Sequence, residues 1–174
     1  MSSINYDLKL IRGFVFDVDG VLSPSVIPMS EEGEPMRKAN IKDGYVLQLA
    51  AKLGYKLAII TGGRSEAVYN RFSALGFKDI YQKASHKIDI FREWMERNGL
   101  KPEEVVYMGD DIPDLKCMRL AGLPCAPRDA VWEARETASY VSRFDGGYGC
   151  VRDVVEQVLK AKGEWMADDK AFGW

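Results

Sequence analysis

The sequence has little cysteine. Its 174 residues include 3 cysteines, Cys117, Cys125 and Cys150, which form no C-x-x-C pair and leave an odd count. This pattern does not support a disulfide framework, so we expect a reduced protein of the cytoplasm.

Long apolar runs are missing as well. No uninterrupted stretch reaches the roughly 18 apolar residues that a conventional membrane span needs. Residues 1–10, MSSINYDLKL, lack a charged segment followed by a long apolar one, so we expect no signal peptide. We therefore expect no membrane partner.

A strong net charge is absent too. The formal net charge is −2 at pH 7, with 24 basic and 26 acidic residues. Because no global basic field would attract nucleic acid, we expect no nucleic-acid partner, and an acidic substrate would need local positive charge.

What the sequence does contain is a regular alternation of short apolar runs with segments of helical periodicity. The expected strands lie at 10–16, 54–63, 103–111, 122–127 and 138–142. The expected helices lie at 43–54, 64–76, 85–99 and 112–122, and each stops at a glycine. This alternation predicts βαβ units and a parallel sheet. We expect one doubly wound, Rossmann-like α/β domain over residues 1–174.

Two segments break this alternation. Residues 22–42, LSPSVIPMSEEGEPMRKANIK, contain three prolines and a central EEGE, which predicts a β-hairpin excursion with SVIPM and PMRKAN as its arms. The tail 162–174 contains two tryptophans and a phenylalanine in a polar stretch, and it has no evident place in a core of its own chain.

The first expected strand ends in an unusual way. In FVFDVDGVLS, residues 14–23, an apolar run is followed by Asp17 and Asp19 and then by Gly20. Burying carboxylates at the end of a core strand is costly unless positive charge lies nearby.

Other polar residues follow the next strands at the same edge of the predicted sheet. Thr61 and Gly62 come after the second strand, Asp110 after the third, and Lys87 falls in the first turn of a helix. In an open parallel sheet, ligands bind at this carboxyl edge. One lysine does not balance three carboxylates, whereas Mg²⁺ suits two of them plus a backbone carbonyl.

A metal would give the pair of aspartates a chemical purpose. One aspartate can attack phosphorus, and the second, two residues later, can protonate the leaving alkoxide. Thr61 and Lys87 would then bind the oxygens of the transferred phosphoryl group.

At this point the sequence resembles the haloacid dehalogenase superfamily of phosphatases. The resemblance rests on FDVDG, IITGG, Lys87 and GDDIPD, which follow one another in order over residues 14–114. It implies that Asp17 is the nucleophile and Asp19 the general acid and base. It also implies that Asp17, the Asp19 carbonyl and Asp110 bind Mg²⁺.

A narrower resemblance concerns 3-deoxy-D-manno-octulosonate 8-phosphate phosphatases. The segments GGYGCVRD (146–153), NIKDGY (40–45) and ALGFKDIYQKASHK (74–87) look like segments of that family. The resemblance implies hydrolysis of this sugar acid phosphate through an aspartyl-phosphate, for lipopolysaccharide precursor synthesis in a bacterial cytoplasm. A related nine-carbon sugar acid 9-phosphate is the alternative substrate.

The far end of such a substrate carries a carboxylate. Thr61 and Lys87 would bind the phosphate, and Gly62 is a further candidate for substrate binding. Arg64 and Arg152 are the candidates for the sugar acid because an arginine can donate two parallel hydrogen bonds to a carboxylate. The family commonly has T-G-R, whereas this chain has TGGR, which displaces Arg64 by one residue. The alternative for Arg152 is that it only anchors the last helix.

Other functions remain open from the sequence alone. A calcium loop is disfavoured because Val21 stands where a ligand oxygen is needed. Receiver domains also combine acidic residues with Thr and Lys but lack an acid two residues after the phosphoacceptor. A non-catalytic relative usually loses one of the four motifs, and all four are present. Asp111 and Asp114 are candidates for helix capping or supporting roles, and Asp114 equally for metal ligation.

The chain has no room for a separate cap domain. Intervals 22–42 and 62–86 are both shorter than the roughly 50 residues that an independent core needs. We therefore expect hairpins from several subunits to pair in a homotetramer that covers the site, together with the tail of a neighbouring subunit. The alternative is a hairpin folded over its own domain.

Overall fold

In the computed structural model, which describes residues 2–174, six parallel strands form one sheet. From one edge to the other the strands are β3 (Asp79–Tyr81), β2 (Lys56–Ile60), β1 (Gly13–Phe16), β4 (Val105–Met108), β5 (Leu123–Ala126) and β6 (Tyr140–Val141). The chain moves outward from β1 first on one side and then on the other. The expected doubly wound sheet is confirmed, with β3 as a strand that the sequence pattern did not indicate.

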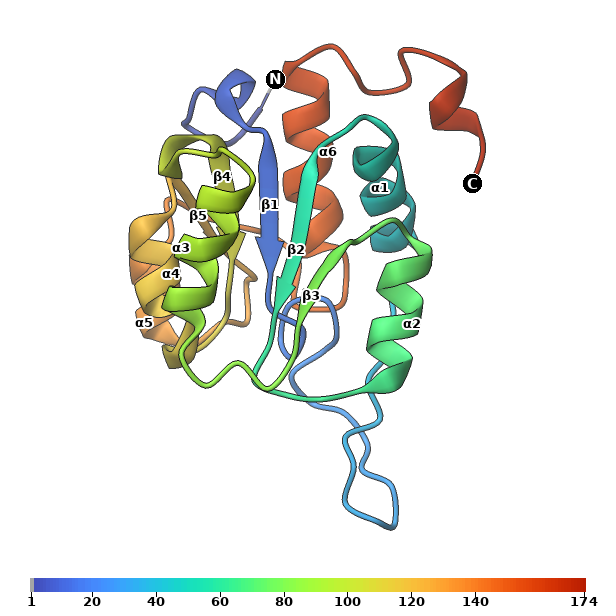
Figure 1. The fold of residues 1–174 in the computed structure, drawn as a ribbon, viewed down its shortest axis with the longest axis vertical. Coiled ribbons are helices and arrows are strands. Elements are labelled where there is room, and N and C mark those ends of the chain that lie inside the picture. The colour runs from blue at the N-terminus through green and yellow to red at the C-terminus, as the bar shows by residue number, and fades with distance from the viewer. Residues whose placement is uncertain (1) are drawn as a thin grey trace.

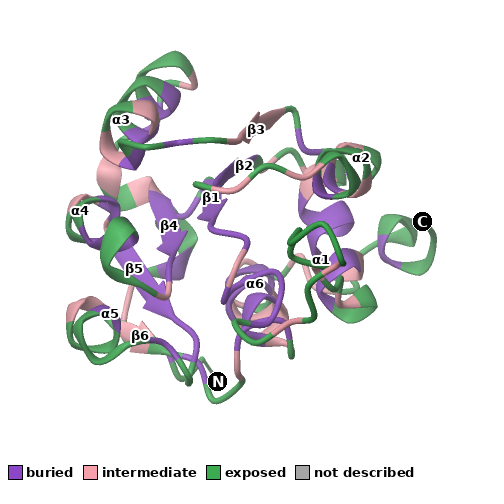
Figure 2. Ribbon diagram, turned by 90° about the horizontal axis from the view of Figure 1, so that it is seen from below, coloured by how far each residue is buried: buried purple, intermediate pink, exposed green. Residues whose placement is uncertain are grey.

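Two layers of helices cover the sheet, as Figures 1 and 2 show. One face is covered by α1 (Ile41–Lys52), α2 (Glu66–Ala74) and α6 (Cys150–Ala161). The other face is covered by α3 (Lys87–Arg97), α4 (Leu115–Leu120) and α5 (Trp132–Thr137). Within residues 2–174, none of these helices is both long and apolar enough to cross a membrane.

The expected elements are shorter in the structure where 3-10 turns replace their ends. Residues Leu8–Leu10 form such a turn, so the first strand begins at Gly13 rather than at residue 10. Residues Ile112–Asp114 form another, which contains a proline, and α4 begins only after it. The α5 helix was not among the expected elements.

The central strands are buried on both faces, which separates the interior into two cores. Along β1, Phe14 and Phe16 pack with α1, α2 and α6, while Val15 packs with α3, α4 and α5. All three are fully buried. Successive side chains of a strand point to opposite faces, so a continuous apolar run satisfies both layers.

The segment after β1 is a hairpin, as expected, but its pairing is short. Met29 and Pro35 form an isolated antiparallel bridge, flanked by hydrogen bonds from Ser30 N to Glu34 O and from Met36 N to Pro28 O. No strand is formed on either arm in the described chain. In Figure 1 the hairpin projects away from the domain at the end where the strands finish.

The C-terminal tail has a place in its own chain, contrary to our expectation. Trp165 and Trp174 each meet the ring of Tyr45 edge to face, with centroids 6.2 Å apart. Ala171 is buried, and Lys52 Nζ donates to the carbonyl of Gly173 at 3.0 Å. The tail therefore packs on α1, and in Figure 1 it lies toward the end of the sheet opposite the hairpin.

Candidate active site

The candidate active site lies where β1, β2 and β4 end. Asp17 follows β1 directly, Thr61 follows β2, and Asp110 follows β4 after one glycine. Because β1 pairs in parallel with both β2 and β4, these three residues reach the same edge of the sheet. The sequence-based placement is confirmed for all three.

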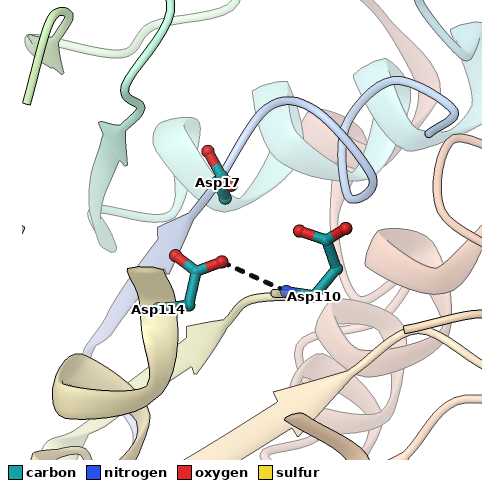
Figure 3. Close-up of side chains that lie close together, drawn as sticks. All are labelled: Asp17, Asp110 and Asp114. Atoms are coloured by element: carbon teal, nitrogen blue, oxygen red, sulfur yellow. Dashed lines mark hydrogen bonds between the residues drawn. The ribbon is translucent and has the colours of Figure 1, made fainter. Parts of the chain in front are cut away.

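Three carboxylates converge at this edge. Asp17, Asp110 and Asp114 each offer an oxygen, and these oxygens lie within 4.8 Å of one another (Figure 3). Asp114 Oδ2 accepts a hydrogen bond from the amide N–H of Asp110 at 3.2 Å, shown as the dashed line. Asp114 is completely buried and Asp17 is 8% exposed. We call these three residues the acidic cluster.

Lys87 supplies the positive charge that the acidic cluster needs. It is the first residue of α3 and is only 5% exposed. Its Nζ lies 3.0 Å from Asp17 Oδ2 and 2.8 Å from Asp114 Oδ1. Burial would lower the pKa of Lys87, but the charges of Asp114 and Asp17 outweigh this effect and raise the pKa. Lys87 therefore stays protonated.

A single lysine does not neutralise the acidic cluster. Burial, followed by the charge of Asp114, raises the pKa of Asp17 to about 7 although Lys87 opposes the shift. Burial and the charges of Asp17 and Asp114 raise the pKa of Asp110 to about 8. Asp110 Oδ1 is buried and has no hydrogen-bond partner among the described residues. A buried carboxylate oxygen without a partner, in a cluster with two other carboxylates, fits a hard divalent cation.

Glycines allow the chain to pack tightly around the acidic cluster. Gly20 has a φ of +83°, and a Cβ there would lie 1.8 Å from Asp110 Oδ2. A Cβ on Gly146, the first glycine of the GGYGCVRD segment, would lie 1.8 Å from the carbonyl oxygen of Gly20. Gly147 N also donates to Val21 O at 2.8 Å. The C-terminal glycine segment thus packs against the loop that follows Asp17.

The loop after β2 places its three candidate residues differently. Thr61 is 4% exposed, and its hydroxyl accepts from the amide of Gly63 at 3.3 Å. Gly62 and Arg64 are exposed. Thr61 is therefore buried at the end of β2, the neighbour of β1 in the sheet, while Arg64 is exposed to solvent.

The Asp19 side chain is not part of the acidic cluster and pairs with an arginine instead. Its carboxylate forms two hydrogen bonds with Arg37, from Nε at 2.8 Å and from Nη2 at 2.9 Å. The Asp19 side chain is 44% exposed and that of Arg37 10%. Sequence reasoning missed Arg37, and the only signal was a basic residue in the hairpin arm PMRKAN.

Asp111 and Asp114 take different roles, which the sequence left open. Asp111 caps the 3-10 turn by accepting from the amide of Ile112 at 2.7 Å. Asp114 instead joins the acidic cluster and accepts from the Tyr107 hydroxyl at 2.9 Å. Tyr107 was also missed, because a tyrosine within an apolar strand looks like an ordinary core residue.

Arg152 does not join the acidic cluster. Its Nε donates to Glu156 at 2.9 Å, and its guanidinium lies over the rings of Tyr45 and Trp165. Its amide N–H donates to Asp43 at 2.9 Å. These contacts support the alternative in which Arg152 anchors the last helix.

The three cysteines take no part in this arrangement. All are free and buried. Burial raises the pKa of the Cys117 thiol to about 12, so it remains protonated and unreactive near neutral pH.

Comparisons with known proteins agree with this geometry. The pattern of the family described as "Haloacid dehalogenase-like hydrolase" matches residues 39–127. A curated relative, 3-deoxy-D-manno-octulosonate 8-phosphate phosphatase KdsC of Escherichia coli K12, is 39% identical over 154 residues, which make up 88% of this chain and 82% of the relative. The protein of the same name from Yersinia pestis is 37% identical over 163 residues, 94% of this chain and 84% of the relative.

Solved structures show the same similarity. One is 3-deoxy-D-manno-octulosonate 8-phosphate phosphatase from Moraxella catarrhalis, in complex with a magnesium ion, a phosphate ion and a KDO molecule. It superimposes with a TM-score of 0.89 at 34% identity and covers 96% of each chain. The cobalt-bound phosphatase YrbI from Haemophilus influenzae gives a TM-score of 0.85 at 26% identity, over 90% of this chain and 92% of that one.

Proposed function

The chain belongs to the haloacid dehalogenase-like hydrolases, and we propose that it hydrolyses 3-deoxy-D-manno-octulosonate 8-phosphate to the free sugar acid and phosphate. The observation that supports this most directly is the acidic cluster with Lys87 bonded to two of its members. Such a buried set of carboxylates has no structural benefit that an apolar core would not provide better. It is the arrangement expected of a phosphoryl-transfer site.

The residues at this site fit Mg²⁺. Asp17, Asp110 and the backbone carbonyl of Asp19 are the proposed ligands, and the buried oxygen of Asp110 without a partner supports this set. Asp114 lies within the same cluster and also orients Lys87, so we propose that it supports the ligands. When bound, the ion neutralises the carboxylates and the oxygens of the phosphoryl group.

The protein's own groups account for the two chemical steps. In the first, Asp17 attacks phosphorus, the bond from phosphorus to the sugar oxygen breaks, and Asp19 gives its proton to that oxygen. In the second, Asp19 removes a proton from water, the water attacks phosphorus, and the bond to Asp17 breaks to release phosphate. Thr61 and Lys87 bind the phosphoryl oxygens during both steps, where negative charge must be stabilised.

Lys87 has a second role in this scheme. Its two short contacts bridge Asp17 and Asp114 and fix the orientations of their carboxylates. The positive charge also favours the ionised form of Asp17, which is the form that attacks.

We propose that Arg64 and the backbone at Gly62 face the sugar end of the substrate. Arg64 is exposed and follows Thr61 by three residues in the chain, which supports this role for its guanidinium. Arg152 is a weaker candidate, because its guanidinium already contacts Glu156, Tyr45 and Trp165 within the chain.

We also propose that the protein is a homotetramer of the bacterial cytoplasm. The exposed apolar side chains of the hairpin support assembly, since Val26 is 88% exposed and Met29 72%. A site without a cap domain stays open to water unless other subunits cover it.

A substrate comparison tests the proposed function. Initial rates are measured with the eight-carbon sugar acid 8-phosphate, the nine-carbon 9-phosphate and p-nitrophenyl phosphate, each with Mg²⁺ and with EDTA. We expect the highest kcat/KM on the eight-carbon substrate and no turnover in EDTA. A higher kcat/KM on the nine-carbon acid 9-phosphate would contradict the proposed substrate. Release of the leaving group only once per subunit, without hydrolysis of the phosphorylated protein, would contradict the proposal that the protein is an enzyme.

A second experiment tests the sugar-binding residues. Arg64→Ala, Arg152→Ala and a chain ending at Lys162 are assayed on the sugar acid phosphate and on p-nitrophenyl phosphate. A loss confined to the sugar acid supports recognition of its carboxylate by the altered residue. Equal losses on both substrates point to stability or assembly instead.

A further inference from the structure

The return arm of the hairpin carries an arginine into the candidate active site. Arg37 is 18 residues from Asp19 in the sequence, yet its Nε and Nη2 bind the two carboxylate oxygens of Asp19 at 2.8 and 2.9 Å. The Arg37 side chain is only 10% exposed, although the arm around it is largely exposed. A bidentate, partly buried pair of this kind fixes the orientation of both partners.

We propose that Arg37 is a positioning residue that holds the Asp19 carboxylate in the orientation needed for proton transfer to the leaving sugar oxygen. The inference rests on the proposed function, in which Asp19 is the general acid. Without Arg37, the half-exposed Asp19 side chain would rotate among several staggered conformers. Proton transfer depends on such orientation, because the acid must lie within hydrogen-bond reach of the oxygen.

The loop after β2 is shaped to leave room for this pair. A Cβ on Gly63 would lie 2.5 Å from Arg37 Nη2 and 3.5 Å from Asp19 Oδ2. Gly63 does not have a positive φ, so its backbone does not itself require glycine. Residue 63 is therefore a glycine because the guanidinium of Arg37 occupies the space that a Cβ would need.

The pair also connects the hairpin to the chemistry. Ser23 Oγ accepts from the amide of Lys38 at 2.9 Å, which ties the return arm to the loop after Asp19. Gly20 N donates to Ser23 O at 2.8 Å in the same loop. A change in the conformation of the hairpin therefore reaches Asp19 through Arg37 and through Ser23.

A different role for Arg37 would be direct binding of the substrate carboxylate. Two donors of its guanidinium are already taken by Asp19, so a substrate carboxylate would have to compete with an intramolecular ion pair. The geometry therefore favours positioning, and the two roles differ in their dependence on the leaving group.

The test measures kcat and KM for Arg37→Ala on a series of phosphate esters. The series includes the sugar acid phosphate, simple alkyl phosphates without a carboxylate, and p-nitrophenyl phosphate, whose leaving group needs no proton. We expect kcat/KM on all alkyl esters to fall by about 10- to 100-fold, since general acid catalysis supplies about 10²- to 10⁴-fold. For p-nitrophenyl phosphate we expect kcat/KM to fall by less than about threefold, because kcat/KM reports the phosphorylation step and this leaving group needs no proton. The kcat values on all esters should fall wherever the second step, in which Asp19 acts as the base, limits the rate.

A double-mutant cycle with Asp19→Asn separates positioning from other roles. If Arg37 acts through Asp19, Arg37→Ala should cause no additional loss in the Asp19→Asn background. Arg37→Lys should restore part of the rate, because a lysine keeps the charge but not the two parallel hydrogen bonds.

Two further variants keep the test interpretable. Gly63→Ala, which displaces the guanidinium without removing it, should reproduce the leaving-group dependence of Arg37→Ala. Lys38→Ala, the matched control on the same arm, should leave the rates unchanged, since the Lys38 side chain is exposed. Circular dichroism and sedimentation check that each variant keeps its fold and its subunit number.

Several outcomes would overturn the positioning role. They are equal losses of kcat/KM on alkyl and p-nitrophenyl esters, a rise in KM limited to the sugar acid, a further loss in the Asp19→Asn background, or dissociation of subunits that accounts for the loss. If the wild type hydrolyses alkyl phosphates but not the sugar acid phosphate, the proposed substrate fails while the Arg37 test still stands on the alkyl series.

Discussion

The acidic cluster and the hairpin lie at the same edge of the sheet, but they are built in opposite ways. In the acidic cluster Asp114 is completely buried, and Lys87, which binds it, is 5% exposed. On the hairpin, Val26 is 88% and Met29 72% exposed, and the arms share one antiparallel bridge. The chemical groups are thus preorganised by the sheet, whereas the segment that would cover them is not.

The two regions differ because the free energy needed to order them differs. A buried charge must have its partners in place, so the acidic cluster is held by β1, β4 and α3 at once. An exposed hairpin with so little pairing gains little from its own contacts, and further burial must come from another surface. We infer that this protein separates a rigid site for phosphoryl transfer from an adaptable region for covering and recognition.

Removal of the nucleophile from the acidic cluster should have the largest effect on activity. Asp17→Asn should lower kcat by more than about 10³-fold, because an amide cannot form the aspartyl-phosphate. Steady-state rates on the sugar acid phosphate and p-nitrophenyl phosphate measure this loss, and a cooperative thermal transition confirms the fold. Retention of near-normal rates on both substrates would refute the assignment of Asp17.

The next largest effect should come from the proposed metal site. Asp110→Ala should lower activity by more than about 100-fold at moderate Mg²⁺ and raise the concentration needed for half-maximal activity. Asp111→Ala is the matched control, since Asp111 only caps a 3-10 turn. Titration of each variant with Mg²⁺ after EDTA treatment measures the difference. Activity that survives chelation in the wild type would exclude the metal.

Changing the hairpin should have a smaller and more selective effect. Replacing Val26 and Met29 together by serine should dissociate the proposed tetramer, since each buried side chain of this size contributes about 1.5–3 kcal/mol. We expect a lower kcat/KM on the sugar acid phosphate with p-nitrophenyl phosphate largely spared. Sedimentation and both assays are run beside a control in which Glu31 and Glu32 at the hairpin tip become serine. A fully active wild-type monomer at micromolar concentration would contradict assembly.

The smallest effect concerns Asp43, where the hairpin meets α1. It is 2% exposed, its Oδ1 accepts from Arg152 N, and its Oδ2 has no partner in the described part of the chain. Burial raises the pKa of Asp43 to about 6, although the amide and the charge of Arg152 oppose the shift. In the unfolded chain the pKa is about 4, so the folded state binds the proton more tightly.

The raised pKa of Asp43 in the folded state makes a specific prediction for the pH dependence of stability. The contribution of Asp43 is fully present below about pH 4 and is lost as the pH rises through about 6. Asp43→Asn keeps an acceptor for the Arg152 amide and cannot ionise. Its free energy of unfolding relative to the wild type should therefore improve by about 1–3 kcal/mol between pH 4 and pH 7. Urea unfolding at both pH values measures the change, and a difference that does not vary with pH would show that Asp43 is not desolvated as described.

Much of this protein follows from local sequence patterns. The alternation of apolar runs and helical segments predicted the parallel sheet, and the strand ends then placed Asp17, Thr61 and Asp110 at one edge. This works because parallel strands must finish side by side, so residues that follow them meet without any further information. Lys87 was found in the same way, from its place in the first turn of α3.

Other features depended on tertiary structure. The pairing of Arg37 with Asp19 runs through an irregular hairpin, and irregular segments have no periodicity from which a direction can be deduced. The sequence left capping, a supporting role and metal ligation open for Asp114, and only the packing of α3 and β4 around it shows that it binds Lys87 and Tyr107 instead of capping α4. The tail packs on α1 because Tyr45 offers its ring there, a contact between residues more than a hundred positions apart. The strands around the site and the acids that follow them could be predicted because the alternation of apolar and polar residues is a local pattern. The partners of those acids come from segments far apart in the chain, so only long-range packing decided them.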